Sequence, residues 1–342
     1  MNDKAYKKMT IKDIAKECGC AIGTVSRVLN NHPDVSEKTR QKVMAVVEKH
    51  GFVLNTNAKQ LKTQDRKNIV IIVKGASSTL LNGLLEKIQK KLEILPYTAN
   101  VVVLDENDNE GMVATRINFE QKPLGFIFLG GSPKKLRGDF EKVHIPSVLI
   151  SNQAESLGSA YISSVSIDNM KASFTSAEFL LKNGHRKIGV IGGALDSEIS
   201  STRYEGFLSA LISAGVHFDF DHSYEIAKYS FEGGALAAKR LIEKNPDITA
   251  VFTMSDAMAI GACRAFRDLG YKVPENISVI GFDGLAISDY LCPRLTTIRQ
   301  IEEELACEGL NVLLDSIENK APCCHKIVPF EFIKGESVKK ID

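Results

Sequence analysis

The stretch TIKDIAKECGCAIGTVSRVLN, residues 10–30, decides the fold of the N-terminal part of the chain because it predicts two short helices around a tight turn. Thr10 and Asp13 have the spacing of a capping box, which starts the first helix. Apolar residues then recur at helical spacing up to Gly19, where the chain must turn. A second helix follows over residues 22–30. The pattern therefore predicts a helix–turn–helix corner.

The second predicted helix has one face of small and polar residues. A helix that lies in the major groove of DNA needs short side chains for close approach, hydroxyls and amides for phosphates, and an arginine for a base edge. The residues on this face are Ile22, Gly23, Ser26, Arg27 and Asn30. The alternative is a surface helical hairpin with no role in DNA binding, and the spacing alone does not separate the two interpretations.

Charge is distributed unevenly along the 342 residues, although the net charge is only +1. Residues 1–67 hold 14 Lys and Arg against 7 Asp and Glu, and the remainder holds 29 against 35. A basic N-terminal module on a mildly acidic body indicates a polyanionic partner at one end of the chain. A solvated basic tail would have the same charge, but the helical pattern within this segment argues against it.

Composition limits the other classes of protein. Apolar residues make up 44% of the chain, so most of it should form a packed core. No run of about 18 apolar residues is present, and the polar N-terminus lacks the features of a signal peptide. Seven cysteines at irregular spacing are most simply reduced thiols. We therefore expect a cytoplasmic protein without a membrane span or a metal site.

The order of predicted elements divides the chain into three parts. A third helix over residues 37–50 completes a headpiece of residues 1–52, and a polar linker follows over 53–67. From residue 68, short apolar strands alternate with helices, which is typical of parallel sheets covered on both faces. Because the pattern restarts near residue 165, we expect two doubly wound α/β lobes. Ligands bind such folds at the carboxyl ends of strands, so a small molecule should lie between the lobes.

Two other functions share parts of this organisation. A solute-binding protein of a transport system has a two-lobed body, but it should carry a secretion signal and no basic headpiece. An enzyme should bring nucleophiles or titratable groups together at diagnostic spacing. The seven histidines do not cluster with carboxylates, and the glycine pairs at 130–131 and 192–193 only end strands. We expect no catalytic residues and no cofactor.

Motifs along nearly the whole chain resemble those of the lactose-repressor (LacI/GalR) family of bacterial transcription regulators. They are TIKDIAKECGCAIGTVSRVLNNHPDVSEKTRQKV (10–43), AKQL (58–61), NGHRKIGVIGG (183–193), RYEGF (203–207), SDAMAIGA (255–262), VPENISVIGFDG (273–284) and RLTTIRQ (294–300). The resemblance implies a homodimeric repressor that binds double-stranded operator DNA and a small effector. It also implies a periplasmic-binding-protein-like body at 68–342, with subdomains of about 68–164 with 297–323, and 165–296 with 324–342.

The same resemblance assigns residues to the DNA contact. Ile22, Gly23 and Arg27 would contact base edges. The residues that would contact phosphates or fix the position of the helix are Thr10, Thr24, Ser26 and Asn30. Residues 53–67 match the family's hinge helix, with Asn55, Ala58 and Leu61 at the DNA. Leu61 would insert into the minor groove at the centre of the operator and kink it. An ordinary linker leucine is the alternative.

In the expected cleft, the resemblance assigns an effector site that departs from the family pattern at several positions. Arg203 and Asp283 match a paired arginine and acid, Tyr229 matches an aromatic position, and Ser255 replaces the usual Asn beside Asp256. The remaining assigned residues are Ser77, Ser78, Leu80, Leu81 and Ser151, where the family commonly has other side chains. A sugar or sugar phosphate is the effector that the family favours. A local salt bridge or helix cap is the alternative for each residue.

Overall fold

We describe a computed structural model that covers residues 10–29, 32, 34–50, 52, 67–75, 77–105, 108–139 and 142–341. The chain forms two compact units, residues 1–66 and 67–342. We call the described part of the first unit the headpiece and the second unit the body. Within the described residues, no helix has the length and apolar character needed to cross a bilayer.

The described part of the headpiece folds into three helices, α1 (Ile11–Glu17), α2 (Ile22–Leu29) and α3 (Glu37–Lys49). The predicted capping box is present, since Thr10 N donates to Asp13 Oδ2 at 2.9 Å and Asp13 N donates to Thr10 Oγ1 at 3.4 Å. Gly19 has a φ of +59°, which a glycine adopts without strain. These local features produce the two-helix corner that the sequence predicts.

A small apolar core holds the three helices together. It consists of Ile14, Ala15, Cys18, Val25, Val28 and Val43, with partly buried residues around it. At the outer surface, Lys49 at the end of α3 pairs with Glu17 of α1 at 2.8 Å. Because so few side chains are buried, this core supplies only modest stability to the headpiece.

The body contains two sheets, each of six strands among the described residues. The strands at residues 68–74, 125–129 and 188–192 have near-continuous apolar sequences because helices cover both faces of each sheet. In spatial order, the first sheet consists of β11 (His325–Val328), β5 (Ile162–Ile167), β4 (Ser147–Ile150), β3 (Gly125–Leu129), β1 (Asn68–Lys74) and β2 (Thr98–Leu104), all parallel.

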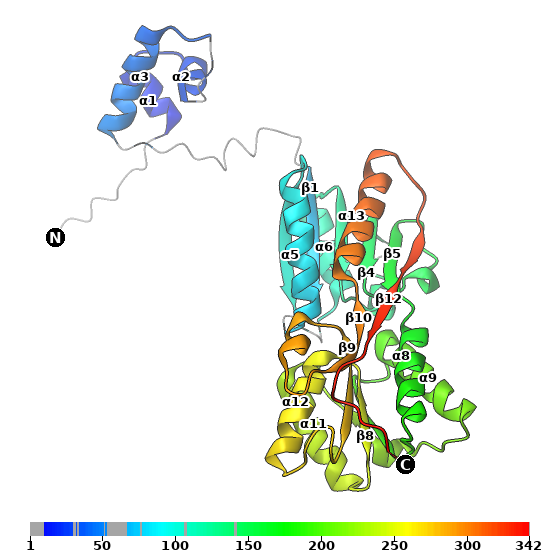
Figure 1. Cartoon of the computed structure of the whole chain (residues 1–342). Helices are drawn as coiled ribbons and strands as arrows, with labels where there is room; N and C mark the ends of the chain where they lie inside the picture. Colours follow the sequence, from blue (N-terminus) through cyan, green and yellow to red (C-terminus); the bar gives the residue numbers. More distant parts are fainter. Residues whose placement is uncertain are drawn as a thin grey trace, which may run out of the picture. The chain divides into compact units, whose positions relative to one another are not determined.

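The second sheet has the same form, except that its edge strand β12 is antiparallel to β10. In spatial order it consists of β12 (Phe330–Ile333), β10 (Thr296–Gln300), β9 (Ser278–Asp283), β8 (Ala250–Thr253), β6 (Ile188–Gly192) and β7 (Tyr224–Ile226). Two mostly parallel sheets in separate lobes confirm the predicted fold class (Figure 1).

Helices pack on the two faces of each sheet (Figure 1). The first lobe has α5 (Thr79–Glu93), α6 (Glu110–Gln121), the short α7 (Pro133–Leu136) and α13 (Glu302–Glu318). The second lobe has α8 (Asn169–Lys182), α9 (Glu198–Ser213), α10 (Phe220–Ser223), α11 (Phe231–Lys244) and α12 (Asp256–Asp268).

The chain crosses between the lobes at three places, and each differs from the expected boundary by a few residues. The first crossing follows β5, which ends at Ile167 in the first sheet, so the expected start of the second lobe at 165 is too early. The chain returns to the first lobe after β10, which ends at Gln300, whereas the expected end of the second-lobe segment is residue 296. The last crossing lies between β11 and β12, so the expected boundary at 324 also falls before a first-lobe strand. Short apolar strands do not show in the sequence which sheet they join.

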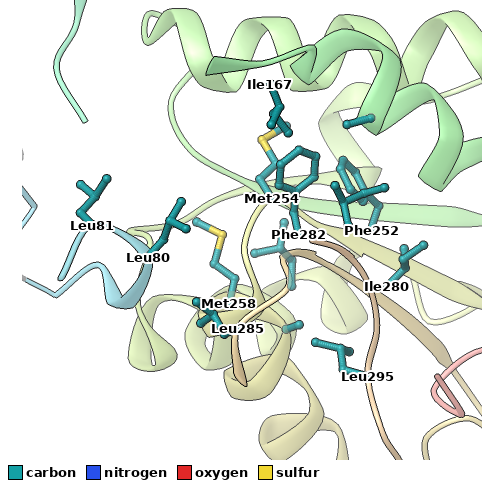
Figure 2. Packing of buried hydrophobic residues seen from close by; sticks show 14 of the residues in the cluster. Leu80, Leu81, Ile167, Phe252, Met254, Met258, Ile280, Phe282, Leu285 and Leu295 are labelled. Atoms are coloured by element: carbon teal, nitrogen blue, oxygen red, sulfur yellow. The ribbon is translucent and has the colours of Figure 1, made fainter. Parts of the chain in front are cut away.

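The lobes pack against each other through apolar side chains. Figure 2 shows Leu80 of α5 pointing toward Met258 of α12 and Leu285 after β9. All three side chains are buried and belong to one continuous cluster that extends through both lobes. This contact fixes one point at which the lobes meet, beside the carboxyl ends of their strands.

Candidate functional site

The exposed face of α2 is the first candidate site. Val25 and Val28 are buried in the headpiece core, which turns the opposite side of the helix to solvent. Gly23 and Arg27 are exposed, and Ile22 is 46% exposed although it is apolar. An exposed branched side chain beside a glycine and a guanidinium suits contact with base edges and thymine methyl groups.

The remaining predicted DNA-binding residues of the headpiece lie around the ends of its helices. Thr10 is exposed at the start of α1, where its side chain is part of the capping box. Thr24 and Ser26 are half-buried on α2. The first turn of α2 forms bonds from the Thr24 and Val25 amides to the carbonyl of Ala21, which has no capping hydroxyl. Asn30, Asn55, Ala58 and Leu61 lie outside the described residues.

The second candidate site is a cavity of about 560 Å³ in the body, within the range of small-molecule sites. Its wall is formed by both lobes, at the carboxyl ends of β1, β3, β4, β6, β7 and β9. Seven of the ten predicted effector residues line it: Ser78, Leu80, Leu81, Ser151, Arg203, Tyr229 and Asp283. Parallel strands place their carboxyl ends together, which explains why residues distant in the chain meet here.

Arg203 is the most constrained polar group on the second-lobe wall. Its side chain is 4% exposed, and its Cζ lies 3.7 Å from the centroid of the Phe282 ring. Its Nε donates to Asn169 Oδ1 at 3.0 Å, and its Nη1 donates to the Met254 carbonyl at 2.5 Å. Its Nη2 lies 3.8 Å from Asp283 Oδ1. These partners fix the orientation of the guanidinium at the cavity.

Asp283 ends β9 at the cavity in a strained backbone conformation, with a φ of +114°. Such strain persists where the surrounding structure holds it, and it is common at ligand sites. Its Oδ1 accepts from Gln300 Nε2 at 2.9 Å. Burial raises the pKa of Asp283 to about 6, while Arg203 acts in the opposite direction. The arginine and the acid thus form a buried polar pair that a ligand can contact.

Tyr229 lies on the same wall, where its hydroxyl is 3.0 Å from Ser200 Oγ. Gly193 allows this arrangement, since a Cβ at that position would collide with both Ser200 and Tyr229. On the first-lobe side, Gly130 has a φ of +69° and packs under Leu81. Gly130, Gly131 and Gly193 therefore line the cavity, and the interpretation that the glycine pairs only end strands was incomplete.

Three predicted effector residues do not line the cavity. Ser77 is exposed beside it. Ser255 is the N-cap of α12, and its hydroxyl accepts from the Met258 amide at 3.1 Å. Asp256 is fully buried behind the wall, and burial raises its pKa to about 7. For Ser255 the alternative of a helix cap describes its position, whereas Asp256, within the described residues, is neither a cap nor part of a salt bridge and accepts internal hydrogen bonds.

The Asp256 carboxylate joins three segments of the second lobe. Its Oδ2 accepts from the Leu285 amide at 2.7 Å and from Ser288 Oγ at 2.8 Å, and its Oδ1 accepts from Thr297 Oγ1 at 2.6 Å. These bonds hold the turn after β9, which carries Asp283, against β10. Asp256 is therefore a positioning residue for the cavity wall.

The first-lobe wall contains polar residues that the sequence analysis missed. Lys74 ends β1 and pairs with Glu110 Oε2 at 2.5 Å, and Lys135 of α7 lines the same wall. Ser132 and Asn152 are also part of it. The sequence did contain one signal for this wall, which is the lysine at the end of an otherwise apolar strand. A charge that is buried there needs a partner. No group of three or more metal-binding side chains lies together in the described part of the chain.

Comparison with known proteins connects both sites to one family. The model of the lacI family of bacterial regulatory proteins matches residues 10–55, and a periplasmic binding protein-like domain matches residues 177–338. The HTH-type transcriptional regulator MalR of Clostridium butyricum is 34% identical over 335 residues, which is 96% of this chain and 99% of that protein.

Solved structures agree in fold. The Lac repressor dimer bound to operator and the anti-inducer ONPF has a TM-score of 0.75 at 22% identity, over 97% of this chain and 100% of that chain. The complex of the transcriptional regulator CelR with cellobiose has a TM-score of 0.72 at 24% identity, over 96% and 99%. The helix–turn–helix headpiece, the two-lobed body and a relative that is similar over nearly its whole length agree with one another. The chain therefore belongs to the LacI family of bacterial regulatory proteins, and it is a DNA-binding transcriptional regulator rather than an enzyme or a transport protein.

Proposed function

We propose that this chain is a repressor that binds a specific operator as a homodimer and is controlled by a sugar or sugar derivative in the body cavity. The observation that carries the proposal is the exposed face of α2, on which Ile22, Gly23 and Arg27 lie opposite the buried Val25 and Val28. The dimer and the operator follow the related Lac repressor structure, and the sugar follows the CelR complex with cellobiose.

In this proposal α2 lies in the major groove and Arg27 donates to a guanine. One such bidentate contact discriminates against a wrong base by about 1–3 kcal/mol. Thr10, Thr24, Ser26 and Asn30 contact phosphates or orient the helix. In the linker, Asn55 and Ala58 lie at the DNA and Leu61 inserts into the minor groove. Unstacking the base step costs energy, which the larger contact surface on the bent DNA offsets.

The body responds to a ligand because polar bonds already join its lobes beside the cavity. Glu198 at the start of α9 accepts from Ser132 Oγ at 3.0 Å and from the Lys134 amide at 3.1 Å. A sugar that contacts Arg203 and Asp283 on one wall and Leu81 on the other changes the balance between open and closed lobes. Such coupling to DNA affinity is typically worth about 1–3 kcal/mol.

A substitution at Arg27 tests the DNA-binding part of the proposal. Selection from a pool of randomised duplexes supplies the operator, and binding is then measured on the operator and on random DNA. We expect Arg27→Ala to weaken operator binding by about 10- to 100-fold and random-DNA binding much less, because a base contact is lost.

The matched control is Lys42→Ala, which removes one exposed cation from α3. It should weaken binding to the two DNAs by similar factors, since a charge away from α2 acts on any phosphate backbone. If Arg27→Ala weakened binding to both DNAs by the same factor, Arg27 would not contact a base.

A further inference from the structure

The linker ends at Lys67 and β1 begins at Asn68, and we call these two residues the linker junction. The Lys67 carbonyl accepts from the Thr98 amide at 2.9 Å. Its ammonium lies 5.6 Å from the centroid of the Tyr97 ring, within the range of a cation–π contact. The Asn68 carbonyl accepts from the Leu124 amide at 2.8 Å. Neighbouring segments of the first lobe therefore fix both the backbone of the junction and the side chain of Lys67.

The Tyr97 hydroxyl connects the linker junction to the end of α13. It donates to Glu318 Oε1 at 2.6 Å, which is the length of a charge-assisted hydrogen bond. Burial and the Glu318 carboxylate raise the pKa of Tyr97 to about 12, so the hydroxyl stays a donor at neutral pH. Glu318 is the last residue of α13, where the helix dipole disfavours a negative charge. A phenylalanine at 97 would pack equally well and a lysine at 318 would suit the dipole, so the stability of the fold does not explain the pair.

Two helices connect this bond with the cavity. The helix α5 begins at the cavity wall with Leu81 and ends shortly before Tyr97. The helix α13 follows Gln300, whose Nε2 donates to Asp283 Oδ1 at the cavity, and it ends at Glu318. Both helices belong to the first lobe and pack against each other (Figure 1). The cavity and the linker junction therefore lie at opposite ends of the same pair of helices.

Close contacts hold the first turn of α13 against α5. Lys87 lies 3.8 Å from the Glu302 carboxylate, and Lys91 lies 2.7 Å from that of Glu303. Gly83 allows this approach, since a Cβ there would lie 2.7 Å from Glu302 Oε2. The first turn of α13 is therefore a pivot. Because the helix is about 25 Å long, a tilt of about 5° at this pivot would move its far end by about 2 Å, enough to break a hydrogen bond there.

We propose that Tyr97 and Glu318 are a positioning pair through which the state of the cavity reaches the linker and changes the affinity for DNA. This inference rests on the proposed function and adds the route by which the body controls the headpiece. The start of α13 follows the crossing at Gln300, so a change between open and closed lobes acts on this helix first. The Tyr97–Glu318 bond then either forms or breaks, and Lys67 is held or released with the Tyr97 ring.

A substitution that changes the contact between the lobes tests this route without a ligand. Glu198→Ala removes the bonds from Ser132 and from the Lys134 amide across the lobes, and Glu198 does not line the cavity. The affinity of the full chain for its selected operator is measured with and without Glu198→Ala. The measurement is made in the wild type, in Tyr97→Phe, which removes only the hydroxyl, and in Tyr161→Phe as the control. The Tyr161 side chain is 40% exposed in the same lobe, just before β5.

We expect Glu198→Ala to change operator affinity about 5- to 10-fold in the wild type and in Tyr161→Phe, the lower range of allosteric coupling. In Tyr97→Phe the same substitution should change operator affinity less than about 2-fold, because the route is broken. Glu318→Ala should act like Tyr97→Phe, and combining the two should add nothing, since both remove one bond. Glu318→Gln keeps an oxygen that accepts the bond and should retain most of the response.

The melting temperature of each variant separates this role from a structural one. A bond that only stabilises the body would lower the melting temperature in Tyr97→Phe and leave the response to Glu198→Ala intact. That result would overturn the inference, while the sugar-controlled repressor stands. A wild-type affinity that Glu198→Ala does not change would also overturn it, since the lobes would then have no effect on the linker. Failure to select any operator over random DNA would instead remove the proposed function itself.

Discussion

The headpiece and the body place their functional groups on opposite sides of a packed core. In the described headpiece, six small or medium apolar side chains form the interior, and the candidate DNA contacts lie on the outer face of α2. The body instead buries whole strands, and its candidate site is an internal cavity. A duplex is larger than the headpiece and must be contacted from outside, whereas a metabolite is held by being enclosed.

The two regions also use charge differently. The headpiece and linker carry a net charge of +7 over residues 1–67, with pairs such as Lys49–Glu17 on the surface. The body has a net negative charge, yet it buries Lys74 and Arg203 at its cavity. Salt screens exposed charges strongly and buried pairs weakly. DNA affinity should therefore fall with ionic strength far more than effector affinity does.

Removing residues 1–66 is the most severe way to test whether the two regions are independent. The boundary falls between the two compact units, so the remaining body should keep its fold and its response to the effector. DNA binding should be lost completely. Circular dichroism and thermal shift check the fold and the ligand response, and electrophoretic mobility shift checks DNA binding. A body that unfolds, or that still retards the operator, would contradict the separation.

Ile14→Ala tests the difference in core size. Ile14 is fully buried in the headpiece, and truncation of a buried isoleucine costs about 2–5 kcal/mol. We expect that loss to unfold most of the headpiece while the melting of the body stays unchanged. Hydrogen exchange followed by mass spectrometry reports the two units separately.

The matched controls for that substitution are Ile71→Ala, in a buried strand of the body, and Ile94→Ala, at an 86% exposed position. Ile71→Ala should lower the stability of the body without unfolding it, and Ile94→Ala should change neither unit. Unaltered exchange in the Ile14→Ala headpiece would mean that its core is stronger than its size suggests.

Asp256→Asn gives the smallest expected effect and concerns only the body. Burial raises the pKa of Asp256 from 3.8 to about 7, so the folded state holds this proton more tightly than the unfolded chain. Stability from the protonated group is fully present below about pH 4 and is lost as the pH rises through 7. The amide does not titrate and can keep the bonds to Leu285 and Thr297.

Relative to the wild type, the Asp256→Asn body should therefore gain stability of about 3 kcal/mol between pH 4 and pH 7. Urea unfolding at a series of pH values measures this difference. Asp268→Asn, at the exposed end of the same helix, should follow the wild-type profile. A constant difference between Asp256→Asn and the wild type across this range would mean that the carboxyl titrates normally.

Much of the fold was predictable because it depends on neighbouring residues. The capping box of Thr10 and Asp13, the turn at Gly19 and the alternation of strands and helices all follow from local sequence. The order of strands in each sheet did not follow, and the three crossings between lobes were each misplaced. A short strand such as β11, whose four residues are half polar, suits either sheet, and only packing selects one.

The sequence by itself determined the helix–turn–helix corner, the basic headpiece and the two-lobed α/β body, since helical period, capping and strand composition are local properties. Only the tertiary structure decided which side chains share the cavity. Lys74 and Glu110 are 36 residues apart, and Arg203 and Asp283 are 80 apart, yet each pair meets at the carboxyl ends of strands. Strand order and lobe packing bring these residues together. They cannot be read from local sequence, because the energy of burying a charge depends on which groups surround it in space.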